Sequence, residues 1–143
     1  MNKNTKNVRV TIESHIGDEK LVSESRGHYL FKDGAHLVTY TDYTGNAVTR
    51  NGMEVREERM LLHRTGTFAG DMLFDPFEDT LFKYNAFVVN AEFILHTEVY
   101  ELMVSDEGIR IRLKYLLSDD EGQEVNRGDQ IITVIFSEEE EEN

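Results

Sequence analysis

Apolar and polar residues alternate along most of this chain. The segment Val8–Glu13 has branched apolar residues at even positions and Arg, Thr and Glu at odd positions. In Ile109–Leu117 the odd positions are all aliphatic or aromatic, whereas Arg110, Arg112 and Lys114 occupy even positions. A period of two indicates a β-strand with one buried face, because a helix would spread these side chains around its circumference.

Turn-forming residues fall where these segments should stop. Gly17, Gly34, Gly45, Gly108 and Gly122 each stand beside Asp, Asn, Thr or Glu, and glycine supplies the positive φ that tight hairpins need. Strands are therefore predicted near Val8–Ser14, Lys20–Phe31, His36–Thr41, Ala47–Val55, Met60–Arg64, Asp71–Phe74, Thr80–Tyr84, Phe87–Val104, Ile109–Leu117 and Gln130–Phe136.

Two places break the alternation. Between Met53 and Leu62 the apolar phase changes from odd to even positions, which requires a turn or bulge at Arg56–Arg59. Asn51-Gly52 is a competing turn. The stretch Phe74–Phe77 contains the single proline of the chain and must interrupt a strand, with an isolated helical turn as the alternative.

No segment carries a sustained helical stripe with caps. Short strands joined by short turns predict an all-β protein, an antiparallel meander closing into a barrel of about 8–10 strands, because closure removes exposed strand edges. We expect a flexible N-terminus over residues 1–7, one barrel domain over residues 8–136, and a disordered acidic tail over residues 137–143.

Charge and composition narrow the classes of partner. The 143 residues include 28 Asp and Glu against 15 Lys and Arg, a net charge of −13, so nucleic acid would be repelled. There is no cysteine, which fits a reducing, cytoplasmic setting without thiolate metal sites. The first residues are polar and no apolar run is long enough to cross a bilayer, so membrane insertion and secretion are not expected. The tail Ser137–Asn143 is interpreted as solvated sequence, with binding to a basic partner as the alternative.

Several short motifs occur in a distinctive order. These are Gly27-His28-Tyr29, Tyr40-Thr41-Asp42 with Gly45 beyond, His63-Arg64-Thr65-Gly66, Met72-Leu73-Phe74, and two final strands over Gly108–Leu117 and Gln130–Phe136. Their order and spacing, from about Val8 to Phe136, resemble the DUF1934 or YwiB-like family of uncharacterised bacterial proteins. The resemblance implies a calycin-like or lipocalin-like β-barrel, and it implies no activity, because the family has none established.

The chain departs from that family at one stretch. Tyr84-Asn85-Ala86-Phe87 stands where the family often has Thr-x-Tyr-Gly, so no role of that stretch is carried over to this chain. The chain also lacks tryptophan, and hence the Gly-x-Trp signature of true lipocalins.

Histidines are the first candidates for site chemistry. The chain has five: His15, His28, His36, His63 and His96. No two are two or four residues apart, so no metal site or other cofactor is predicted. The first three stand beside turns and should lie on the surface. Only His63 and His96, both within strands, are positioned to point into a barrel.

Arg64 is the cation most suited to a barrel mouth, because it ends an apolar strand beside Thr65-Gly66. Its planar fork of donors could hold a carboxylate or phosphate; the alternative is a structural arginine satisfied by backbone carbonyls or an acid, or an exposed one. Tyr40 and Tyr84 are the best polar handles within a large aromatic set. That set could line a pocket, or it could simply fill the barrel.

Two function classes remain open. The first is a cytoplasmic β-barrel that binds a small, partly apolar or anionic ligand at one mouth, through Arg64, Tyr40, Tyr84, His63 and His96. The second is a solid barrel acting in structure or interaction, through self-association as a homodimer or through a protein partner. An enzyme is not favoured and no catalytic residue is assigned, because no nucleotide, hydrolase or metalloprotease motif is present.

Overall fold

The computed structural model describes residues 5–86 and 89–137, and it contains ten β-strands. Their bounds are β1 Lys6–Ile16, β2 Glu19–Lys32, β3 Ala35–Thr44, β4 Ala47–Val55, β5 Met60–Gly66, β6 Phe68–Phe74, β7 Thr80–Ala86, β8 Val89–Ser105, β9 Gly108–Ser118 and β10 Glu124–Phe136. The described residues contain no helix, and therefore no helix that could cross a membrane.

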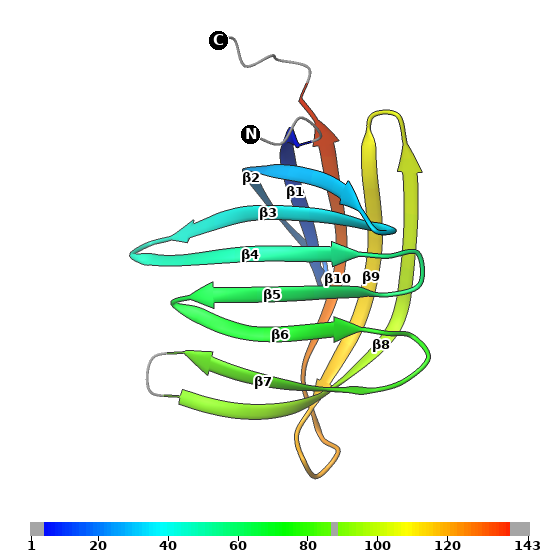
Figure 1. Ribbon diagram of the computed structural model, residues 1–143. Helices are drawn as coiled ribbons and strands as arrows, with labels where there is room; N and C mark the ends of the chain where they lie inside the picture. The colour runs from blue at the N-terminus through cyan, green and yellow to red at the C-terminus, as the bar shows by residue number, and fades with distance from the viewer. Residues whose placement is uncertain (1–4, 87–88, 138–143) are drawn as a thin grey trace.

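The strands form one closed antiparallel barrel. Each strand pairs with the next along the chain, and β1 pairs with β10, from Val8 opposite Phe136 to Ser14 opposite Gln130. Figure 1 shows β1, β9 and β10 running steeply while β3–β7 cross them at a large angle. The barrel is thus flattened into two crossed layers with one interior between them. The predicted all-β meander is confirmed.

The strand β2 forms a corner between the two layers. It pairs with β1 from Glu19 to Tyr29, but with β3 only from Gly27 to Lys32. A Cβ on Gly27 would overlap the carbonyl oxygen of Thr39, so glycine permits this close approach. On the N-terminal side of Gly27, β2 is no longer paired with β3, and the barrel wall opens between these two strands.

The two ends of the barrel differ. The closed end carries the turns β2–β3, β4–β5, β6–β7 and β8–β9, and its interior is filled with fully buried aliphatic side chains such as Val38, Val55 and Ile111. Tyr100 crosses this end and donates a hydrogen bond to the Arg56 carbonyl at 2.6 Å. The open end carries the β1–β2, β3–β4, β5–β6 and β9–β10 turns. The interior is therefore filled toward the closed end.

Several predicted boundaries shift. The first strand begins at Lys6, so residues 6 and 7 belong to the barrel and not to a flexible terminus; the Ser137 amide donates to the Asn7 carbonyl at 2.8 Å. The last strand begins at Glu124, well before the predicted Gln130.

The predicted turn at residues 56–59 is confirmed, and the competing turn at Asn51-Gly52 lies inside β4. Residues 75–79 form a turn, as the proline predicted, without a helix. Phe87 and most of the acidic tail, residues 138–143, lie outside the described residues.

Candidate functional site

Inward-facing side chains change from apolar to polar toward the open end. On β5 the inner face reads Met60, Leu62, Arg64, and on β4 it reads Met53, then Asn51. Met53 pairs with Leu62, and Asn51 pairs directly with Arg64. The period of two thus carries one polar layer into the barrel above the apolar core.

A hydrogen-bonded chain joins Arg64 to an inner carboxylate. The Nε of Arg64 donates to Asn51 Oδ1 at 3.2 Å, and Asn51 Nδ2 donates to Asp42 Oδ2 at 3.1 Å. Ser25 Oγ donates to the other oxygen of Asp42 at 3.5 Å. Asn51 is only 3% exposed, so its amide is locked between the cation and the carboxylate.

The guanidinium of Arg64 keeps most of its donors unused. Arg64 is half-buried, and no carboxylate of the described residues lies within ion-pairing distance of it. Only its Nε has a hydrogen-bond acceptor within the described chain. A partly buried cation normally finds an anion, because its desolvation is costly. The two terminal nitrogens of Arg64 are therefore available to a ligand.

A pocket of about 400 Å³ opens beside this guanidinium. Its walls combine one cation, aromatic rings and aliphatic side chains. It is lined by Arg64, Met72, Phe82, Tyr84, Phe93, Tyr115, Leu117, Val125 and Asn126. Ligand pockets commonly measure about 300–1,000 Å³, so this volume suits a small molecule.

Glycine and ring packing shape the pocket walls. Tyr115 pairs with Gly128 across β9 and β10, and a Cβ at Gly128 would overlap the tyrosine ring. Because Gly128 has no side chain, the Tyr115 ring can lie over β10. On the opposite wall, the Phe82 ring lies 5.9 Å from Tyr84 and 6.1 Å from Phe93, between centroids. Because this tilted packing already holds the rings in place, they lose little conformational entropy when a ligand binds.

The positive charge of Arg64 affects the pKa values of two tyrosines. Burial, assisted by the Asp42 carboxylate and opposed by Arg64, raises the pKa of Tyr40 to about 12. Burial also raises the pKa of Tyr115, again opposed by Arg64. Both phenols are neutral at physiological pH and can donate hydrogen bonds.

The raised pKa of Tyr40 predicts a loss of stability in alkali. In the unfolded chain the phenol ionises near 10.0, whereas the folded state holds its proton up to about 12. Its contribution is complete below pH 10 and disappears as the pH rises toward 12. One pKa unit corresponds to about 1.4 kcal/mol. Between pH 10 and pH 12 the free energy of unfolding of the unmodified protein should therefore fall by about 2–3 kcal/mol more than that of Tyr40→Phe. Denaturant titrations of both proteins on either side of pH 10 measure this; parallel curves would contradict it.

The predicted site residues divide into two groups. Arg64 and Tyr84 line the pocket, and Tyr40 is buried beside the polar chain without lining the pocket. His63 and His96 do not point into the barrel, so that expectation was wrong. Each follows an inward-facing leucine, and alternation turns both outward, where the ring Nδ1 of His63 pairs with Asp71 and that of His96 with Asp79.

Sequence reasoning missed Asn51 and Asp42 as site residues. Asn51 shares the odd-numbered phase of Met53 and Val55, so the alternation itself placed it inward. Its pairing with Gly52 as a turn signal hid that phase. No three His, Asp or Glu side chains of the described residues gather in a metal-binding arrangement.

Comparison with known proteins gives a family and a fold. The family model described as "Domain of unknown function (DUF1934)" matches residues 6–130. The crystal structure of ywiB protein from Bacillus subtilis superimposes with a TM-score of 0.78, at 19% sequence identity, covering 94% of each chain. No curated protein matches.

Proposed function

Because this chain belongs to the DUF1934 family, whose members share a domain of unknown function, we propose from its own geometry that it binds a small carboxylate with an apolar body. The single observation that carries the proposal is the Arg64 guanidinium, half-buried and without an ion pair in the described chain, at a pocket of about 400 Å³. The remaining lining residues are mainly aromatic and aliphatic, with the polar groups of Tyr84, Tyr115 and Asn126 among them, so the walls suit a ligand body that is partly apolar.

The anchoring of Arg64 favours a carboxylate. Asn51 holds the Nε, so the end of the guanidinium with both terminal nitrogens is left for the ligand. Two parallel N–H donors match the two oxygens of a carboxylate. The Asp42 carboxylate lies one residue further along the hydrogen-bonded chain and disfavours a ligand with two negative charges. The ligand should therefore be a monoanion.

The pocket favours a binding role over a solid barrel. Had aromatic residues filled the open half as aliphatic residues fill the closed half, interaction through the outer face or self-association would be the better explanation. Instead Phe82, Phe93 and Tyr115 stand around space beside an unpaired cation. A homodimer stays a separate prediction, to be measured by native mass spectrometry.

A matched pair of probes tests the proposal. We expect 3-phenylpropionate to bind at least about tenfold more tightly than 3-phenylpropionamide, because the amide keeps the apolar body but loses the charge that Arg64 recognises. Isothermal titration calorimetry gives both affinities. Amide-proton shifts should appear on β5, β7 and β9 and be absent from the closed end.

Equal affinities would contradict recognition of charge at Arg64. Shifts confined to the outer surface would show that the pocket is not the site. Native mass spectrometry of protein purified from its own host would then identify any retained molecule, whose mass and charge the proposal restricts to a small monoanion.

A further inference from the structure

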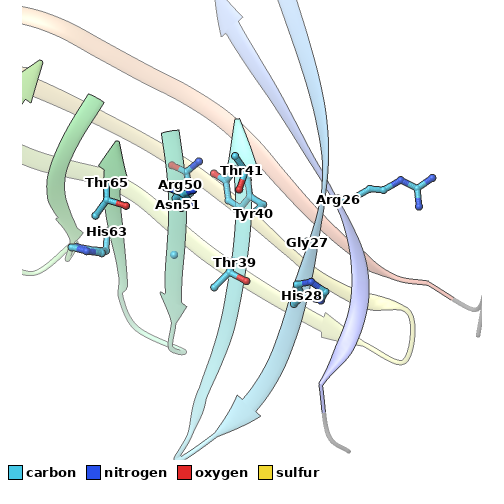
Figure 2. Close-up of a pocket in the computed structure, with 11 residues that line it drawn as sticks. Arg26, Gly27, His28, Thr39, Tyr40, Thr41, Arg50, Asn51, His63 and Thr65 are labelled. Carbon is cyan, nitrogen blue, oxygen red and sulfur yellow. The ribbon is translucent and has the colours of Figure 1, made fainter. Parts of the chain in front are cut away.

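A second hollow lies on the outside of the barrel, over β2–β5 (Figure 2). Its volume is about 460 Å³. We call it the outer groove; it is lined by Arg26, Gly27, His28, Thr39, Tyr40, Thr41, Arg50, Asn51, Gly52, His63 and Thr65. None of these residues is acidic, although the chain as a whole carries a net charge of −13.

Strand register arranges the outward side chains of the groove in two rows. One row runs His28, Thr39, Gly52, His63 from β2 to β5. In the next row Thr41 pairs with Arg50, and Arg50 pairs with Thr65. Hydroxyl and basic groups therefore alternate across the groove. This pattern supplies hydrogen-bond donors on every strand.

Gly52 makes the floor of the groove. A Cβ built on Gly52 would meet no atom within 4 Å, and its φ is not in the left-handed region. The backbone therefore needs no glycine at this position for steric reasons. The missing side chain instead leaves a recess between Thr39 and His63, into which a compact group could settle against the sheet.

The arginines of the groove are uncommitted. Neither Arg26 nor Arg50 has an ion-pair partner among the described residues. The nearest acid along the first row, Asp71 on β6, is already hydrogen-bonded to His63. Figure 2 shows Arg26 reaching away from the other side chains, so it must swing inward to join a ligand. The absence of an ion pair leaves it free to do so.

We propose that the outer groove binds the phosphate or diphosphate group of a small organic phosphate. Arg26 on β2 and Arg50 on β4 both line the groove, and their long guanidinium side chains can converge on one diphosphate. Threonine hydroxyls between them supply further donors to phosphate oxygens. A compact anion is favoured over a long polyanion, because the acidic body would repel any chain extending beyond the groove.

The cations of this site and of the pocket at Arg64 lie on opposite faces of the barrel wall. Arg50 and Asn51 are neighbours on β4, and alternation sends the Arg50 side chain outward and the Asn51 side chain into the interior. Asn51 also lines the groove, so the two sites meet at this residue, but the charged group that each ligand would contact is different.

Inorganic pyrophosphate is the probe that tests the proposal. Titration at low ionic strength, followed by amide-proton shifts and calorimetry, should show saturable binding centred on β3–β5. Arg50→Gln should weaken it by about tenfold or more, through loss of one charge-assisted contact. Gly52→Val should weaken it as much by filling the recess, while the melting temperature stays equal or rises, because valine suits a strand.

Two control variants distinguish a site from general attraction. Arg110→Gln and Arg112→Gln each remove an exposed outward arginine from β9; both should bind pyrophosphate as the unmodified protein does. Absence of pyrophosphate binding overturns the proposal, as does full binding by folded Gly52→Val. Equal losses in Arg50→Gln and Arg110→Gln, or tighter binding of a single-stranded oligonucleotide than of pyrophosphate, also overturn it.

Discussion

Replacement of Gly108 with alanine is expected to lower the free energy of unfolding by about 3 kcal/mol or more, a large share of the roughly 5–15 kcal/mol that stabilises a typical domain. Gly108 has φ +150 and begins β9, opposite Ile135 of β10 and Ser105 of β8. An added Cβ would overlap the carbonyl oxygen of Val134 and lie 2.9 Å from its carbonyl carbon. Because these are backbone atoms of a central ladder, no side-chain rotation relieves the clash.

Gly52→Ala is the matched control for this prediction. Its new Cβ would meet nothing within 4 Å, so it should change the free energy of unfolding by less than about 1 kcal/mol. Urea titration of both variants gives the comparison. A stable Gly108→Ala protein would mean that β8 and β10 can move apart here, and that the contact of three strands at Gly108 is not rigid.

The barrel wall was predictable because it rests on local physics. Alternation in Ile109–Leu117 gave the inward face of β9, including Tyr115, and the acidic glycine turns gave the hairpins. The phase change between Met53 and Leu62 located the β4–β5 turn, since a one-residue shift reverses the buried face. These features depend only on neighbours along the chain.

The start of β10 was missed because its pattern is not apolar. Residues 124–129 are mostly polar and exposed, and Val125 is 49% exposed. They are strand because they extend the ladder with β9 past the core, from Asn126 opposite Leu117 to Asp129 opposite Lys114. Pairing with a well-ordered partner, and not burial, decides the structure there.

The candidate site was only partly predictable for a related reason. Arg64 was identifiable as a cation ending an apolar strand, but its partner Asn51 comes from another strand and is fixed by cross-strand register. Register follows from closure of the whole barrel, which no short window of sequence contains. The outer groove, built from rows across β2–β5, was invisible for the same reason.

Arg64→Lys is expected to weaken binding of 3-phenylpropionate by about tenfold or more. Lysine keeps the positive charge, but its ammonium cannot offer two parallel N–H donors to a carboxylate while it also bonds Asn51. Loss of the 3.2 Å bond from Nε to Asn51 should cost the ligand-free protein only about 0.5–1.5 kcal/mol, because Arg64 is half-buried at the mouth and the ammonium can remain hydrated there.

Calorimetry with 3-phenylpropionate measures the role of Arg64 in binding, and urea titration without ligand measures its role in stability. Arg112→Lys, on the outer face of β9, is the matched control and should change neither quantity. If Arg64→Lys instead lost about 3 kcal/mol of stability while folded protein bound the probe unchanged, Arg64 would be a structural arginine that closes the barrel. A ligand site would then have to be sought elsewhere, since the remaining pocket side chains carry no positive charge.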